Sequence, residues 1–190
     1  MSNVLRWDEL NILKQDAETF IRQAEKRKPT AEEMDRWLGY MEYVLCLIYD
    51  YGWKDAEEVI GPVATQYRMR LESEAVNLEL DGETFRDRVR EQVKLASLAG
   101  LLRIIETEAH RDYNTGVYDA ARESGETGLM KRWHTMLDNR VRDPHAYMEG
   151  MKVGLEDYFY TYTGDYTLYP GGFGVPDLDI NCRCWVTIER

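Results

Sequence analysis

The sequence predicts an α+β protein, in which a mainly α-helical N-terminal region is followed by a small β-containing C-terminal lobe packed on a long helix. Two observations predict this class. Apolar residues recur at helical spacing through most of residues 8–121, whereas after Gly128 that spacing disappears and Tyr, Thr and Gly become dense. The composition changes near residue 125 without a flexible linker. We therefore assign residues 1–95 to the helical region and residues 96–190 to a domain that includes the lobe.

Pro29 separates the first two predicted helices. Residues 8–28 place an apolar side chain at every third or fourth position, which forms one stripe along a helix. Thr30 and Glu33 then have the spacing of a capping box, in which each side chain bonds the backbone amide of the other. A second helix begins there, and we expect it to end near Gly52.

A third helix is predicted between residues 62 and 78. Pro62 suits the first position of a helix because its missing N–H would have no partner there. Asp81 and Gly82 form a turn after this helix, since both residue types tolerate turn conformations.

The longest helical pattern covers residues 85–121. Thr84 suits its start, and a break is expected near Ser97 or Gly100. Gly125 marks the end, because glycine readily adopts the left-handed conformation that terminates helices.

The C-terminal lobe is predicted from shorter signals. Residues 131–136 and 159–162 have strand-like composition, and residues 185–188 can form a final strand. Asp143 and Pro144 resemble the cap and first position of a short helix. Residues 169–176, which read YPGGFGVP, predict an irregular loop.

The charge balance argues against general nucleic-acid binding. The chain has 24 Lys and Arg against 35 Asp and Glu, a net charge of -11, and most of its surface should repel phosphate. One cluster of basic residues could form a local basic patch. Asp and Glu residues next to it balance its charge, so we favour an ordinary solvated helix face. Its members are Arg86, Arg88, Arg90, Lys94 and Arg103.

Neither a leader nor a membrane segment is expected. Residues 1–28 contain no apolar core like that of a signal peptide, and no apolar run in the chain is long enough to span a bilayer. The three cysteines, Cys46, Cys182 and Cys184, are too few and odd in number for a disulfide framework. We therefore expect a soluble protein made in a reducing cytoplasm.

Three C-terminal segments carry a family resemblance. They are IETEAHRDYNTGVYDAA at residues 105–121, KRWHTMLDNRVRDPHAYMEG at residues 131–150, and YPGGFGVPDLDINCRCWVTI at residues 169–188. In this order and spacing they resemble the head-morphogenesis domain of the Mu F type, found in minor head proteins of tailed phages. Residues 1–95 are similar to the helical lead-in of short minor head proteins.

The resemblance implies a structural role in phage head morphogenesis and no known reaction. It implies binding to the portal protein or the major capsid protein, with no membrane partner. It also implies a location in the virion, in the capsid interior or at the portal vertex, after assembly in the host cytoplasm. No residue is assigned a catalytic role.

Cys182 and Cys184 form a CxC pair that could chelate zinc, with His145 as a third ligand. Relatives carry further cysteine or histidine ligands, and the corresponding positions here are Arg142 and Asp179. An arginine cannot bind a metal ion. We therefore favour a chain without a cofactor and keep zinc as an alternative.

The favoured interpretation of the same region is a structural polar cluster. In it Arg140 or Arg142 pairs with Asp138, Glu108 or Glu106 and ties the long helix to the lobe. The expected members are Glu108, Arg111, Asp138, Arg140, Arg142, His145 and Asn181.

Two other functions stay open. A zinc-stapled interaction module is one, and an effector enzyme or toxin-like domain carried in the head is the other. Glu106 and Glu108 form an ExE motif similar to that of ADP-ribosyltransferases, but on a helix these side chains point about 200° apart.

The lobe is rich in aromatic residues, too many for it to bury completely. They either form a surface for a partner or cover a thin core. The set consists of Tyr158, Phe159, Tyr160, Tyr162, Tyr166, Tyr169 and Phe173.

Overall fold

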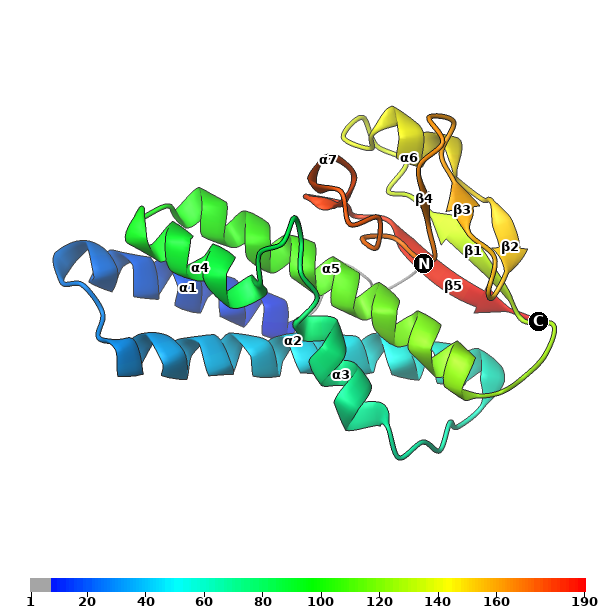
Figure 1. Cartoon of the computed structure of the whole chain (residues 1–190), viewed down its shortest axis with the longest axis horizontal. Helices are drawn as coiled ribbons and strands as arrows, with labels where there is room; N and C mark the ends of the chain where they lie inside the picture. Colours follow the sequence, from blue (N-terminus) through cyan, green and yellow to red (C-terminus); the bar gives the residue numbers. More distant parts are fainter. Residues whose placement is uncertain (1–7) are drawn as a thin grey trace.

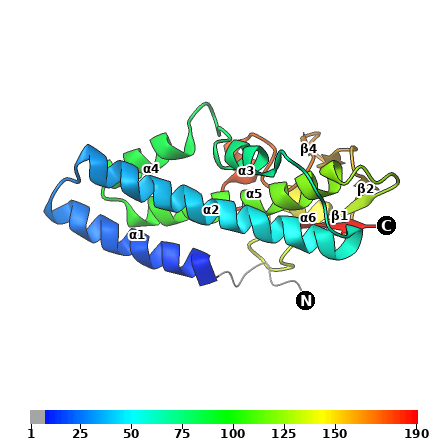
Figure 2. The same ribbon diagram turned by 90° about the horizontal axis from the view of Figure 1, so that it is seen from below.

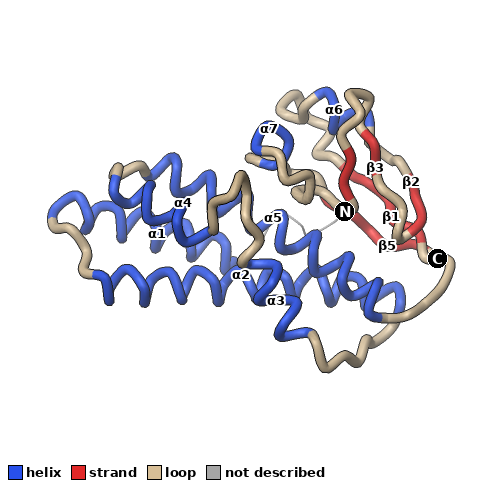
Figure 3. Tube along the Cα trace, in the orientation of Figure 1, coloured by secondary structure: helices blue, strands red, loops and turns tan. Residues whose placement is uncertain are grey.

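The structure is a computed structural model that describes residues 8–190. A layer of helices occupies one side of the molecule, and a small lobe that holds the strands packs at one end of it (Figures 1 and 3). The α+β prediction is confirmed. We expected residues 1–28 to contain no leader, and residues 1–7 of that segment lie outside the described range. Within residues 8–190, no helix is both long and apolar enough to cross a membrane.

Helices α1 (Asp8–Lys26) and α2 (Ala31–Ile60) form an antiparallel pair (Figure 2). The capping box is confirmed: Glu33 N donates to Thr30 Oγ1 at 3.2 Å, and Thr30 N donates to Glu33 Oε2 at 2.8 Å. The predicted end of α2 near Gly52 is wrong, because the helix continues to Ile60.

Gly52 is buried inside α2 because α5 crosses there at close range. A Cβ atom on Gly52 would overlap the carbonyl oxygen of Tyr113, and a Cβ atom on Gly116 would overlap the carbonyl oxygen of Tyr49. The two glycines thus let the backbones of α2 and α5 touch. This contact explains a glycine that sequence reasoning took for a terminator.

Helix α3 (Arg68–Val76) begins later than predicted from Pro62. Residues 61–67 form a loop instead, in which Val63 N donates to Glu57 Oε1 at 2.8 Å and Thr65 Oγ1 donates to Glu123 Oε2 at 2.9 Å. The turn at Asp81 and Gly82 is confirmed.

Helices α4 (Phe85–Lys94) and α5 (Leu98–Glu123) replace the single long pattern, with the predicted break between them. Thr84 caps α4 by accepting from Asp87 N, and Ser97 caps α5 by accepting from Gly100 N. Every residue from 107 to 121 is buried, because α5 packs on α1, α2, α3, α4 and the lobe. The boundary we placed at residues 95–96 stays a prediction.

The lobe contains two small antiparallel sheets. In the first, β1 (Met130–His134) lies between β2 (Lys152–Gly154) and β5 (Trp185–Glu189), with Trp133 opposite Val186. The second is the hairpin of β3 (Phe159–Tyr160) and β4 (Tyr166–Thr167). Short helix α6 (Asp143–Tyr147) lies between β1 and β2 in the chain, and α7 (Pro176–Asp179) follows the loop at residues 169–175. The sequence did not predict β2, β4 or α7.

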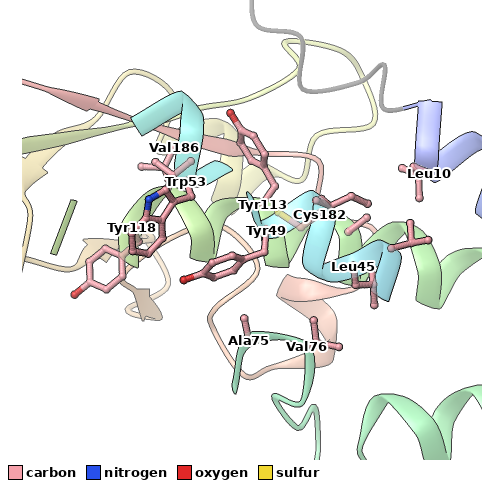
Figure 4. Close-up of a cluster of buried hydrophobic side chains, with 14 of the residues drawn as sticks. Leu10, Leu45, Tyr49, Trp53, Ala75, Val76, Tyr113, Tyr118, Cys182 and Val186 are labelled. Carbon is pink, nitrogen blue, oxygen red and sulfur yellow. The ribbon is translucent and has the colours of Figure 1, made fainter. Parts of the chain in front are cut away.

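The helices and the lobe share one hydrophobic core. Figure 4 shows Tyr49 and Trp53 of α2, Tyr113 of α5, and Cys182 and Val186 of the C-terminal segment in the same cluster. The lobe is therefore held on α5 by apolar packing as well as by the polar contacts described next.

Candidate functional site

Helix α5 carries an unusual number of buried polar side chains. A buried polar group destabilises the fold unless it is hydrogen-bonded, so each should have a partner on a neighbouring element. Tyr49 of α2 donates to Asp119 at 3.0 Å, and Thr107 Oγ1 accepts from Asn181 N at 3.0 Å. The polar positions of α5 therefore define where its neighbours attach.

Asn114 of α5 makes the densest set of contacts with the lobe. Its Nδ2 donates to the carbonyl oxygens of Cys184 at 3.1 Å and Pro170 at 3.2 Å, and also to His110 within the helix at 2.8 Å. Its Oδ1 accepts from Val186 N at 3.0 Å. This one amide fixes the backbone on both sides of Trp185 to the helix.

The CxC pair and His145 meet in the core of the lobe. Cys182 and Cys184 lie two residues apart in an extended segment, which turns both thiols inward and directs the intervening Arg183 outward. The Nδ1 atom of His145 lies 3.6 Å from Cys182 Sγ and 3.5 Å from Cys184 Sγ. The three side chains are only 1%, 3% and 2% exposed.

Hydrogen bonding between the thiols separates their acidities. The bond from Cys184 lowers the pKa of Cys182, and His145 lowers it further, against the effect of burial. The same bond and burial raise the pKa of Cys184. Cys182 is therefore the more acidic of the two thiols.

Two residues hold the segments that carry this cluster. Arg142, at the start of α6, donates to the carbonyl oxygens of Leu178, at 3.4 Å, and Ile180. Asp179 accepts backbone N–H bonds from Phe173, Gly174 and Val175 at 3.1, 2.7 and 3.2 Å. Burial raises the pKa of Asp179 to about 6, although these bonds oppose the effect.

A second buried cluster joins α4 to α5. Arg88 Nη1 donates to Glu108 Oε1 at 2.8 Å, and Arg111 pairs with the same carboxylate. Asp112 is fully buried beside them, with its Oδ1 3.7 Å from Arg111 Nε and no hydrogen bond to either oxygen among the described residues. Burial raises the pKa of Asp112 to about 8, against the influence of Arg111.

The predicted polar cluster is not a single unit. Glu108 and Arg111 lie together in the α4–α5 cluster, while His145 joins the cysteines. Asp138 pairs with Arg183 at 2.7 and 2.8 Å instead of with Arg140 or Arg142.

The remaining predicted members make backbone contacts. Arg140 donates its N–H to Asp138 at 3.0 Å, Arg142 binds the two carbonyls, and Asn181 N binds Thr107. The expected ion pairs of Arg140 and Arg142 with Asp138, Glu108 or Glu106 were therefore wrong, because partners distant in sequence compete more effectively. The residues missed were Arg88, Asp112, Asn114, Asp179 and Arg183.

Glu106 and Glu108 face different surroundings, as expected for a helical ExE motif. Glu108 is fully buried between two arginines, whereas Glu106 is half-exposed and pairs with Lys14 of α1. The two carboxylates therefore have different partners and do not form one site.

Four of the five members of the basic cluster, all except Arg103, pair with acidic side chains in the described residues. Arg86 binds Glu42 at 2.6 Å, Arg90 binds Asp35 at 2.9 Å, and Lys94 lies 3.1 Å from Glu91. Arg88 departs from the predicted solvated face, because it is turned inward to Glu108.

The aromatic residues of the lobe divide into core and surface. Phe159 is buried, and Tyr169 and Phe173 pack partly buried against the core. The other four aromatic residues of the set are exposed, and so is Tyr147 of α6. The ring centroids of neighbouring pairs among these five tyrosines lie 5.0–6.5 Å apart. We call this set the tyrosine surface: Tyr147, Tyr158, Tyr160, Tyr162 and Tyr166, which are 58%, 42%, 54%, 57% and 56% exposed.

Comparison with known proteins agrees with this architecture. A family model described as phage Mu protein F like protein matches residues 74–187. Over 98 residues the chain is 30% identical to minor head protein GP7 of Bacillus phage SPP1, covering 51% of this chain and 32% of that protein. Over 96 residues it is 35% identical to NAD(+)–arginine ADP-ribosyltransferase EFV of Enterococcus faecalis, covering 50% of this chain and 19% of that protein.

The chain therefore spans a third or less of the length of these two relatives. No solved structure matches it. The family model covers more than half of the 190 residues and includes α5 and nearly all of the three C-terminal segments and the lobe. The chain belongs to the phage Mu protein F like family of minor head proteins.

Proposed function

We propose that this protein is a structural component of the phage head that binds the portal protein or the inner surface of the capsid during assembly and stays in the virion. Family membership supports a structural role in head morphogenesis. The observation that carries the proposed binding role is the tyrosine surface, which is the largest group of exposed aromatic residues on the described lobe.

The tyrosine surface has the chemistry of a protein interface. Tyrosine offers a large rigid ring at low entropic cost, together with a hydroxyl that bonds a partner. Tyr147 contacts Tyr162, and Tyr158, Tyr160 and Tyr166 contact one another, so binding would order few additional side chains. Because the net charge of -11 disfavours DNA, we assign the surface to a protein partner.

Copurification tests this proposal. A tagged full-length chain is coexpressed with the portal protein or the major capsid protein of the phage that encodes it. We expect one of them to copurify, and the double variant Tyr160→Ala/Tyr166→Ala to reduce its recovery about 10-fold or more, as loss of aromatic anchors does. Circular dichroism should show unchanged helix content, because both side chains are exposed.

Tyr43→Ala/Tyr67→Ala is the matched control, since these exposed tyrosines lie on α2 and next to α3, outside the lobe. This control should keep full recovery of the partner. Equal loss in both double variants, or a chain recovered free of particles and portal complexes, would contradict the proposal.

We propose further that the chain has no enzymatic activity of its own. The ADP-ribosyltransferase relative is matched over 19% of its length, and Glu108 is enclosed by Arg88 and Arg111 where no substrate can reach it. The test is release of nicotinamide from NAD⁺ by the purified chain. If the chain releases nicotinamide and Glu108→Gln abolishes the release, the chain is an effector enzyme instead.

A further inference from the structure

The cluster of His145, Cys182 and Cys184 has a geometry that hydrogen bonding alone explains poorly. One imidazole nitrogen lies nearly equidistant from two thiol sulfurs, at 3.5 and 3.6 Å. Nδ1 has either one proton or one lone pair in the ring plane, so it can make an aligned hydrogen bond with only one sulfur at a time. A metal ion placed among the three atoms would satisfy all of them together.

The separations match those of a tetrahedral zinc site. With Zn–S of about 2.3 Å and Zn–N of about 2.05 Å, a tetrahedral angle places sulfur and nitrogen about 3.5 Å apart. The two observed distances between sulfur and nitrogen agree with this value. The three potential ligand atoms all lie within 4.8 Å of one another.

Charge and burial select the kind of ion. Two thiolates and a neutral imidazole offset the charge of a divalent cation, so the occupied site would carry no net charge into the buried core of the lobe. Soft sulfur ligands favour zinc over magnesium or calcium. His145 Nε2 is buried and makes no hydrogen bond within the described residues, which leaves Nδ1 as the nitrogen directed at the cluster.

The backbone around the cluster is already fixed. Thr107 holds Asn181 N, Asn114 holds Cys184 O, and Arg142 holds the carbonyls of Leu178 and Ile180. Arg142 thus cross-links α6 to the segment before Cys182 through hydrogen bonds, next to the point where a metal would cross-link them through His145. Ligands held in place in this way lose little entropy on binding.

We propose that His145, Cys182 and Cys184 bind one zinc ion as a structural site that fastens α6 to the C-terminal segment. The site goes beyond the proposed binding role, since it lies in the core of the lobe and needs no partner protein. Three protein ligands leave the fourth position of the ion to a water molecule. Binding displaces the protons of both thiols, so affinity should fall as the pH is lowered.

The test uses the reduced full-length chain, stripped with a chelator and titrated with zinc against a colorimetric competitor. We expect one zinc per chain. Zinc should protect two of the three thiols from a thiol-reactive dye, and cobalt in its place should give the intense visible bands of a tetrahedral thiolate site. At free zinc about 100 times Kd, the midpoint of thermal unfolding should rise by about 5–10 °C.

Cys184→Ala should abolish zinc binding, and Cys46→Ala is its matched control because Cys46 lies on α2 outside the cluster. The control should still bind one zinc per chain. With zinc bound, it should show one reactive thiol fewer than the wild type. Thiol protection and the cobalt spectrum are measured on the wild-type chain, so the test does not depend on the folding of a variant. All three thiols reacting equally with and without zinc, and no cobalt–thiolate absorption, would overturn the proposal.

Discussion

At the scale of single residues, the buried ionisable groups of α5 destabilise the fold unless each is paired or neutral. Glu108 has two arginine partners, but Asp112 has no hydrogen bond to either carboxylate oxygen among the described residues. Burial raises the pKa of Asp112 to about 8, so the folded protein retains a proton that the unfolded chain releases near its ordinary value of 3.8. Folding is therefore linked to protonation of this one side chain.

The sign of the linkage follows from proton counts. Between about pH 4 and pH 8 the folded state binds more protons at Asp112 than the unfolded state does, so this group lowers the free energy of unfolding as the pH rises. Asp112→Asn removes that dependence. We expect the stability of the variant relative to the wild type to increase by up to about 10-fold in the folding equilibrium constant per pH unit from pH 5 to pH 8.

Urea unfolding of both proteins at four pH values in this range measures the difference. Asp177→Asn is the control, since Asp177 is exposed and should leave the dependence unchanged. A constant difference between Asp112→Asn and the wild type across the range would show that Asp112 is ionised in the folded protein.

At the scale of elements, the crossing of α2 and α5 sets the architecture. Gly52 and Gly116 each lie against a carbonyl group of the opposite helix, so neither position has room for a methyl group. Backbone atoms cannot rotate away as a side chain can. The two helices must separate if either glycine is replaced.

Gly52→Ala and Gly116→Ala should each lower the free energy of unfolding by about 3 kcal/mol or more, at the upper end of overpacking costs. Gly39→Ala is the control on α2, because nothing lies within 4 Å of the added atom. That substitution should stabilise by about 0.5–1 kcal/mol through helix propensity. Chemical denaturation followed by tryptophan fluorescence distinguishes them, and equal effects at Gly39 and Gly52 would refute the close crossing.

Sequence reasoning succeeded for elements whose signals are local. The caps at Thr30 and Thr84 depend on residues three positions away, and both were located correctly, while Ser97 was located only as a break between helices. Gly52 was misread because its role depends on Tyr113, which is far away in the sequence. Strands of two or three residues, such as β2 and β4, are too short to show a period.

The candidate site was predictable to a similar extent. The CxC spacing and His145 indicated one cluster, and the structure brings these three residues together. The ion pairs were not predictable, because Arg88 and Arg183 compete for Glu108 and Asp138 only once the chain has folded. Asn114 gave no signal, since a single Asn in a helix usually faces solvent.

At the scale of the whole molecule, the lobe depends on the helices for its position. Lys131 of β1 shows this: its Nζ donates to Leu155 O at 2.6 Å and lies over the ring of Tyr118 of α5 at 5.0 Å. Burial lowers the pKa of Lys131 to about 8. Together with Asn114 and Thr107, this contact contributes to the polar part of the junction between the lobe and α5.

Asn114→Asp should destabilise the protein by about 3 kcal/mol or more, because a carboxylate cannot donate to the carbonyls of Pro170 and Cys184. Asn77→Asp is the control, since Asn77 is exposed and bonds only within its own helix end. Thermal unfolding measures both. A fall in stability no larger than that of the control would mean that apolar packing alone holds the lobe.

The contacts of Asn114 also limit how the lobe can associate. Strand β5 has a neighbour, β1, on one side only, so its other border would offer free peptide groups to any extended chain. The amide of Asn114 occupies that border as a peptide group would, accepting from Val186 N and donating to Cys184 O. At this point the border of β5 is already occupied, so a foreign strand could add there only by displacing the side chain of Asn114.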